Sequence, residues 1–165
     1  PIAEGPVIQE ANLRSLAQGT TTDKVFELTK KLSGRVDTPL VYMTYLNVLF
    51  KYGYDKFLQN AKDAGISGVI VPDLPYEEKD ELQSVAEKYD IDVISLIAPT
   101  SEDRIKMIAS DAKGFIYTVS SMGVTGMRNE IKTDLQSIVS HIKSVTDVPV
   151  AFLSVAFILY LPTVL

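Results

Sequence analysis

Cysteine is absent from the 165 residues, and histidine occurs only once, at position 141. Without cysteine the chain can form no disulfide, no thiolate metal site and no thiol nucleophile. A lone histidine on a predicted helix is far more often a surface residue than a catalyst, and one histidine leaves too few ligands for a zinc site. We therefore expect no bound metal. The lack of disulfides is compatible with a reducing cytoplasm, where we expect the protein to reside.

Clusters of lysine and arginine are also missing, because the 16 basic residues are dispersed and the net charge is −5. Nucleic-acid binding requires closely spaced cations, so this class of partner is not expected. The first ten residues lack the basic and apolar segments of a signal peptide. Residues 151–165 carry no charge, but this stretch is shorter than the roughly 20 residues of a membrane helix, and Pro162 interrupts it. It predicts a buried strand followed by a divergent apolar tail over residues 152–165, with no membrane span.

Short apolar runs rich in β-branched residues alternate with amphipathic helical patterns. Nearly continuous apolar runs are typical of strands buried on both faces of a parallel sheet. The predicted strands are residues 39–46, 68–72, 92–98, 114–120 and 148–155. The predicted helices are residues 8–18, 23–32, 54–64 and 76–89, one that begins near Thr100, and one around 135–142.

This alternation predicts a single α/β domain over residues 1–165, with parallel strands and right-handed crossovers. Strand spacing alone leaves two architectures open. Five strands suit an open doubly wound sheet, whereas a (β/α)8 barrel normally needs about 250 residues.

The carboxyl ends of parallel strands are where α/β proteins place their sites. After the fourth predicted strand the chain reads Gly123-Val124-Thr125-Gly126. Glycines allow backbone N–H groups to approach an anion closely, so this loop is typical of phosphate binding. Arg128 lies near enough in sequence to attract the same phosphate.

Five segments in order resemble the tryptophan synthase alpha chain family and together cover roughly residues 1–150. They are PIAEGPVIQEANLRSLAQGTT, MTYLN, GVIVPDLPYEE, LIAPTS and GFIYTVSSMGVTG. The resemblance implies a (β/α)8 TIM barrel, present as an incomplete barrel of about strands 3 to 7. It also implies a lyase of tryptophan biosynthesis that splits indole-3-glycerol phosphate into indole and glyceraldehyde 3-phosphate. The implied partner is a tryptophan synthase beta chain in an α2β2 complex, with pyridoxal phosphate only on the beta chain and no cofactor on this one.

The resemblance also assigns roles to individual residues. Glu4 matches a catalytic aspartate that holds the indole N–H, although its side chain is one methylene longer, and small misplacements reduce rates. Asn47, Asp73 and Thr100 match positions near the beta-chain interface or the loop scaffold, and we do not expect them to be catalytic. The implied substrate-binding residues are Ile8, Met43, Ile70 and Leu96 against the indole, Tyr117 reaching the substrate, Thr125 in a closing loop and Gly126 at the phosphate.

Two features of the family have no counterpart in these residues. The family's general acid/base, a glutamate on its second strand, would precede Pro1, and the glycines of an AVGFGIS-like segment are replaced by Ala151-Phe152-Leu153-Ser154-Val155. We therefore expect a fragment or degenerate product with impaired activity, whose open strand edges favour association or poor solubility. The alternatives are an inactive fragment that retains only folding or beta-chain contact, and another phosphate-binding α/β barrel. A ribulose-phosphate epimerase would need metal-ligating histidines that His141 alone does not supply.

Overall fold

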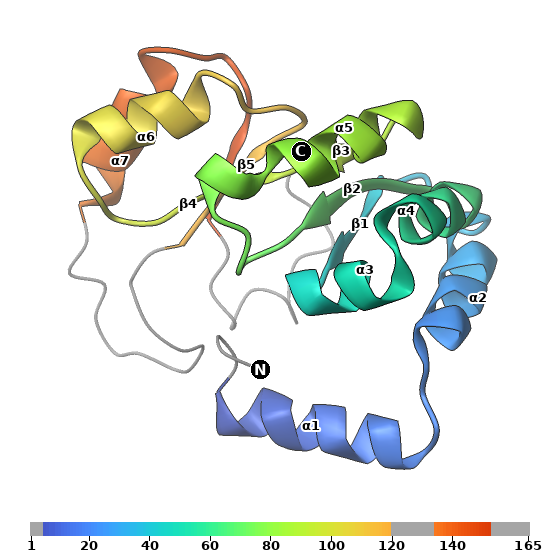
Figure 1. Cartoon of the computed structure of the whole chain (residues 1–165). Helices are drawn as coiled ribbons and strands as arrows, with labels where there is room; N and C mark the ends of the chain where they lie inside the picture. The colour runs from blue at the N-terminus through green and yellow to red at the C-terminus, as the bar shows by residue number, and fades with distance from the viewer. Residues whose placement is uncertain (1–4, 120–133, 153–165) are drawn as a thin grey trace. The chain divides into compact units, whose positions relative to one another are not determined.

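The computed structural model describes residues 5–119 and 134–152 (Figure 1). The chain divides into two compact units, one formed by Val7–Ile94 and the other by Pro1–Pro6 together with Ser95–Leu165. The single domain expected from the sequence stays a prediction.

The unit Val7–Ile94 contains a three-stranded parallel sheet in the order β1-β2-β3 (Figure 1). Helices precede the first strand and connect each strand to the next, which is the βα repeat predicted from the sequence. In chain order the elements are α1 Pro6–Ala17, which starts one residue before the unit, α2 Thr22–Ser33, β1 Leu40–Met43, α3 Leu46–Tyr52, α4 Tyr54–Asp63, β2 Ile66–Ile70, the short 3-10 helix η1 Tyr76–Glu78, α5 Asp80–Lys88 and β3 Asp92–Val93.

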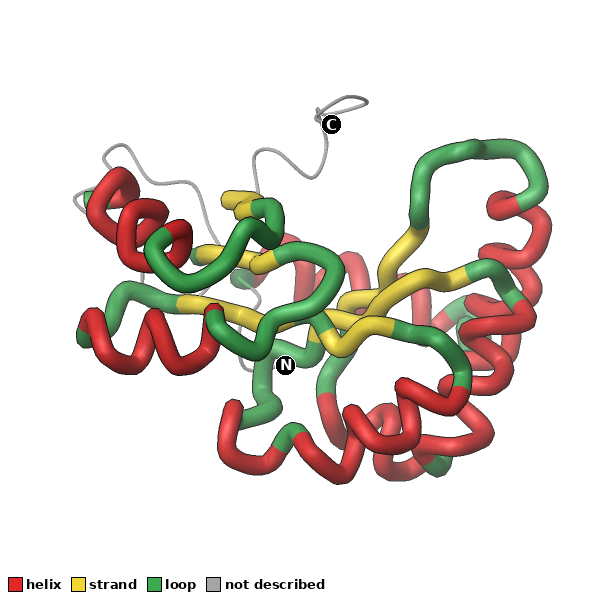
Figure 2. The backbone as a smooth tube through the Cα atoms, turned by 90° about the horizontal axis from the view of Figure 1, so that it is seen from above, coloured by secondary structure: helices red, strands yellow, loops and turns green. Residues whose placement is uncertain are grey.

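The second unit repeats the pattern with the parallel order β4-β5-β6. Figure 2 shows the alternation of helices and strands along the backbone. Its elements are β4 Ser95–Ile97, α6 Glu102–Ala109, β5 Ile116–Thr118, α7 Leu135–Lys143 and β6 Val150–Phe152. The prediction of parallel α/β structure is confirmed in both units. No helix within the described ranges has the length and hydropathy to cross a bilayer.

Two predicted strands differ from the structure. The run 39–46 ends as a strand at Met43, because Leu46 already begins helix α3. The run 92–98 forms two strands, since β3 pairs with β2 while β4 pairs with β5. Between them, the Ile94 amide donates to the Val69 carbonyl at 2.9 Å. An apolar run therefore locates a strand, but its ends depend on hydrogen-bond partners that lie far away in the sequence.

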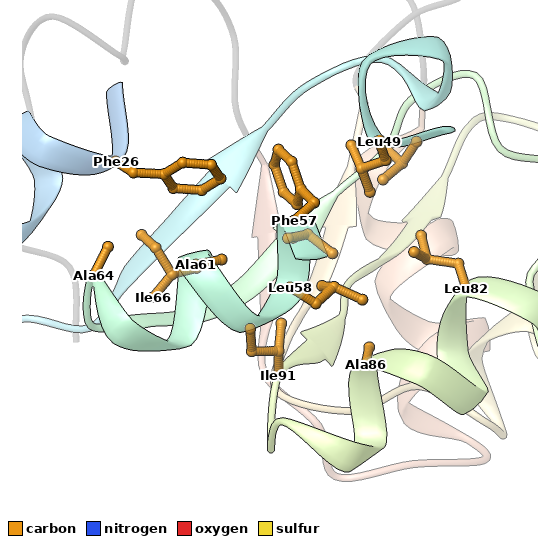
Figure 3. Close-up of a cluster of buried hydrophobic side chains, with 12 residues drawn as sticks. Phe26, Leu49, Phe57, Leu58, Ala61, Ala64, Ile66, Leu82, Ala86 and Ile91 are labelled. Carbon is orange, nitrogen blue, oxygen red and sulfur yellow. The ribbon is translucent and has the colours of Figure 1, made fainter. Parts of the chain in front are cut away.

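The core of Val7–Ile94 lies where helices α2 to α5 pack on the sheet (Figure 3). Four aromatic rings from α2, β1, α3 and α4 meet edge to face, namely Phe26, Tyr42, Tyr52 and Phe57. Tyr52 also donates a hydrogen bond to Asp23 and accepts one from Asn60. Edge-to-face pairs prefer this geometry because the positive ring edge meets the negative ring face.

Strand β1 lies at the edge of its sheet, with one backbone side unpaired among the described strands. Val41 and Met43 on this strand are exposed, and so are Leu28 and Leu32 on α2. Exposed apolar residues beside an open strand edge promote association between chains. The association expected from the sequence stays a prediction.

The core of the second unit forms between its sheet and helices α6 and α7. It is mainly aliphatic and consists of Ile97, Ile105, Ile108, Ala109, Ile116, Ile138 and Ile142. Thr118 lies among these apolar residues at 0% exposure, in register with Ile97 and Phe152. Its hydroxyl has no hydrogen-bond partner among the residues that the structure describes.

We predict that Thr118→Val stabilises the protein by about 1 kcal/mol, because valine keeps the shape and removes a buried hydroxyl without a partner. Urea denaturation followed by circular dichroism measures the change. The matched control is Thr29→Val, since the buried Thr29 hydroxyl donates to the Val25 carbonyl at 2.9 Å. The control should destabilise, and a loss of stability in Thr118→Val would contradict the assignment.

Candidate functional site

The carboxyl ends of β1 and β2 bring two predicted substrate-binding residues together. Met43 and Ile70 are partners in the strand register, and the Thr44 amide donates to the Ile70 carbonyl at 3.1 Å just beyond them. Partners in a parallel register point to the same face of the sheet. Met43 is 47% exposed, whereas Ile70 is 3% exposed and packed. The pair, which we call the Met43–Ile70 wall, forms an apolar surface at this edge.

The loop that follows β2 is tied to the start of helix α3. Asp73 accepts a hydrogen bond at 2.8 Å from the backbone amide of Leu46, the first residue of α3. The N-cap residue Tyr45 makes no side-chain cap. A carboxylate at a helix N-terminus accepts a hydrogen bond from an amide that has no partner within the helix. Its negative charge is also stabilised by the positive end of the helix dipole. Asp73 therefore joins the loop after β2 to the start of α3, and its assignment to the beta-chain interface or the loop scaffold stays a prediction.

In the second unit, Leu96 and Tyr117 are register partners, and Ala151 follows on β6. Tyr117 alternates with Ile116 and Thr118, so its ring lies on the opposite face of β5 from those two. Tyr117 is 8% exposed, and burial raises the pKa of its hydroxyl. The hydroxyl therefore stays protonated at neutral pH and is able to donate a hydrogen bond.

The remaining predicted site residues are not brought together by the described structure. Ile8 lies on α1, a helix with no buried residue. Glu4, Thr125, Gly126 and Arg128 lie outside the described residues. The pairs Met43 with Ile70 and Leu96 with Tyr117 belong to different units, and each pair is described within its own unit.

His141 makes a surface contact between two helices. Its Nε2 lies 3.4 Å from Glu102 Oε2, and Lys106 Nζ lies 2.5 Å from Glu102 Oε1. The hydrogen bond from Lys106 and the charge of His141 lower the pKa of Glu102. Ser101 caps α6 by accepting a hydrogen bond from the Arg104 amide at 3.4 Å. These residues link helices α6 and α7, and the absence of a catalytic role for His141 stays a prediction.

No three His, Cys, Asp or Glu side chains group closely enough to hold a metal ion within residues 5–119 and 134–152. The absence of a metal site and of a cofactor on this chain stays a prediction.

Comparison with known proteins gives one consistent result. The profile of the family "Tryptophan synthase alpha chain" matches residues 1–153. The chain is 50% identical over 151 residues to the tryptophan synthase alpha chain of Lacticaseibacillus casei, covering 92% of this chain and 57% of that protein. It is 48% identical over 149 residues to that of Alkaliphilus metalliredigens, covering 90% of this chain and 56% of that protein.

Solved structures agree with the sequence relatives. The alpha subunit of tryptophan synthase from Campylobacter jejuni superposes with a TM-score of 0.80 at 39% identity, covering 92% of this chain and 61% of that chain. A structure of the tryptophan synthase α2β2 complex from Pyrococcus furiosus gives a TM-score of 0.80 at 34% identity, covering 92% and 62%.

Parallel βα units and this structural similarity define an α/β protein of the (β/α)8 barrel class, present as an incomplete barrel. The chain spans between half and two thirds of the length of these relatives. It belongs to the tryptophan synthase alpha chain family. Family membership favours the barrel over the open doubly wound sheet and over a different phosphate-binding barrel.

Proposed function

We propose that this chain takes part in the reaction of its family, the aldol cleavage of indole-3-glycerol phosphate to indole and glyceraldehyde 3-phosphate in tryptophan biosynthesis. The observation that supports this is the register pairing of Met43 with Ile70 at the carboxyl ends of β1 and β2. In the other unit, Leu96 pairs with Tyr117 in the middle of β4 and β5. Within each unit, such a pair suits one part of an indole ring because burying apolar area against it releases water.

The cleavage breaks the bond between the indole ring and the glycerol phosphate. The ring carbon gains a proton, while the hydroxyl that becomes the aldehyde loses one, so the reaction depends on general acid/base catalysis. In our proposal Glu4 holds the indole N–H, Tyr117 contacts the substrate, Thr125 closes over it and Gly126 contacts the phosphate. No residue of the 165 replaces the family glutamate that protonates the ring carbon. We therefore propose that these residues alone have impaired lyase activity.

The proposed partner is a tryptophan synthase beta chain. The Pyrococcus furiosus relative is described as part of an α2β2 complex, and we propose the same type of assembly here. Pyridoxal phosphate would reside on the beta chain, and no residue in our proposal for this chain requires a cofactor. We propose the cytoplasm as the compartment, because the substrate and product belong to amino-acid biosynthesis.

Incubating the purified chain with indole-3-glycerol phosphate and measuring indole release tests the proposal. We expect a rate at least about a hundredfold below that of the full-length Lacticaseibacillus casei relative, since general acid/base groups contribute roughly 100-fold to 10,000-fold. Rates of the same order in the two proteins would contradict impairment. Because the chain has no tryptophan, fluorescence of added indole reports binding directly. Binding without turnover supports impaired catalysis, whereas absence of both overturns the proposed substrate.

A further inference from the structure

We propose that Asp73 is a positioning residue that holds the Met43–Ile70 wall in place for the indole ring. The inference rests on the proposed function, because that function makes the Met43–Ile70 wall a contact surface for the indole ring of the substrate. It goes beyond a helix cap, since it connects the Asp73 carboxylate with the geometry of a binding surface.

Two hydrogen bonds join the segment that follows Met43 to the segment that contains Ile70 and Asp73. The first joins the Thr44 amide to the Ile70 carbonyl at 3.1 Å, directly beyond the last residues of β1 and β2. The second joins the Leu46 amide to the Asp73 carboxylate at 2.8 Å. Each bond therefore lies within three residues of Met43 on one strand and of Ile70 on the other. The second bond thus adds a side-chain link between the two loops beyond the strand ladder.

The two wall residues differ in how their side chains are held. Ile70 is packed in the core, so its neighbours set its position. Met43 is 47% exposed and flexible, so fewer contacts hold its side chain and its position follows that of its backbone. That backbone leads through Thr44 and Tyr45 into α3, where Leu49 is fully buried. Asp73 fixes the start of this helix, and through it the direction in which the chain leaves Met43.

The chemistry of the bond suits a positioning role. The amide of Leu46 is one of the free donors at a helix N-terminus, and Tyr45 does not satisfy it with its side chain. A carboxylate acceptor gives a shorter and stronger hydrogen bond than a neutral one. Asp73 is 27 residues away in sequence, so the bond joins the loop after β1 to the loop after β2. A local cap would have stabilised α3 without joining the two loops.

The test compares Asp73→Ala, Asp73→Asn and the parent chain, with Asp90→Asn as control. Asp90 carries a carboxylate in the same unit, but it precedes β3 and pairs with Lys62 at 3.0 Å. Two readouts are used: the dissociation constant of indole from its own fluorescence, and the carbon-13 methyl shift of Met43. Met107, on helix α6 of the other unit, serves as the internal reference.

We expect Asp73→Ala to weaken indole binding about tenfold and to move the Met43 methyl signal, because the half-buried amide loses its acceptor. Asp73→Asn keeps an acceptor oxygen and should remain within about threefold of the parent. Asp90→Asn should change neither readout. If Asp73→Ala does not fold, Asp73→Glu replaces it, since its carboxylate is displaced by one methylene and should act in the same direction.

An Asp73→Ala chain that loses stability but keeps the parent's indole affinity and Met43 signal overturns the inference and leaves Asp73 as a helix cap only. If the parent itself does not bind indole, the proposed function fails, and the Met43 signal alone decides the inference. A shifted signal then supports the positioning role, and an unchanged signal overturns it.

Discussion

Replacing Gly65 by alanine should destabilise the protein by about 2–4 kcal/mol. Gly65 follows helix α4 with φ of +82°, a conformation that strains residues carrying a Cβ atom. An added Cβ would lie 2.8 Å from Ser33 Cβ and 2.9 Å from Ser33 Oγ, at the end of helix α2. Backbone strain and overlap therefore act together, and α2 or the turn into β2 must shift. Urea denaturation of the purified variant measures the loss.

Two other glycines separate these contributions. Gly53 also has positive φ, +88°, but no atom lies within 4 Å of an added Cβ, so Gly53→Ala should cost only the backbone strain, about 1–3 kcal/mol. Gly34 has φ of −74° and open space, so Gly34→Ala should be close to neutral. Adding Ser33→Gly to Gly65→Ala should recover the steric part of the loss. Equal losses in all three single variants would refute the proposed overlap.

Shortening Leu58 to alanine should cost about 3 kcal/mol. Leu58 is 0% exposed on helix α4, and Figure 3 shows it on the side of α4 that faces α5. It belongs to one buried cluster with Leu82, Ala86 and Ile91. Removing three carbon atoms there loses the transfer free energy and leaves a cavity that the surrounding helices fill only in part. Thermal and urea unfolding give the change in the free energy of unfolding.

Leu28→Ala is the matched control, because the side chain of Leu28 is exposed on helix α2 of the same unit. Alanine has at least the helix propensity of leucine, so this variant should lie within about 0.5 kcal/mol of the parent. A loss at Leu28 as large as that at Leu58 would mean that the outer face of α2 is covered in solution.

Helix α4 shows what local sequence predicts well. An amphipathic run ends at Gly65, and the helix ends at Asp63 with the Gly65 amide donating to the Lys62 carbonyl at 2.9 Å. The signal was local because glycine at a helix C-terminus adopts the left-handed conformation at little cost.

Helix α3 shows the opposite case. The apolar run from Pro39 extends to Leu46, and after Asn47 apolar residues resume at Val48-Leu49-Phe50, so composition gives no signal that the strand ends at Met43 and the helix begins at Leu46.

The same contrast holds for the site. Sequence resemblance matched Met43, Ile70 and Leu96 to positions against the indole and Tyr117 to a residue reaching the substrate, and the strand register pairs Met43 with Ile70 and Leu96 with Tyr117. It placed Asp73 near the beta-chain interface or in the loop scaffold without naming its hydrogen-bond partner. The partner is Leu46, and no local pattern marks a backbone amide that lacks an acceptor. Tyrosine at position 45 is not a preferred N-cap residue, which indicates that the helix needs another acceptor but not which residue supplies it.

The amino-acid sequence by itself determined the βα alternation, the family and the residue types at the strand ends, because periodicity and motif order are properties of neighbouring residues. Tertiary structure alone decided that β1 ends at Met43 and that the run 92–98 divides between two sheets. It also decided that the Thr118 hydroxyl is buried without a hydrogen-bond partner among residues 5–119 and 134–152. These features depend on which distant segments lie side by side. A strand ends where its ladder partners end, and a hydroxyl is satisfied only if another chain segment brings an acceptor to it.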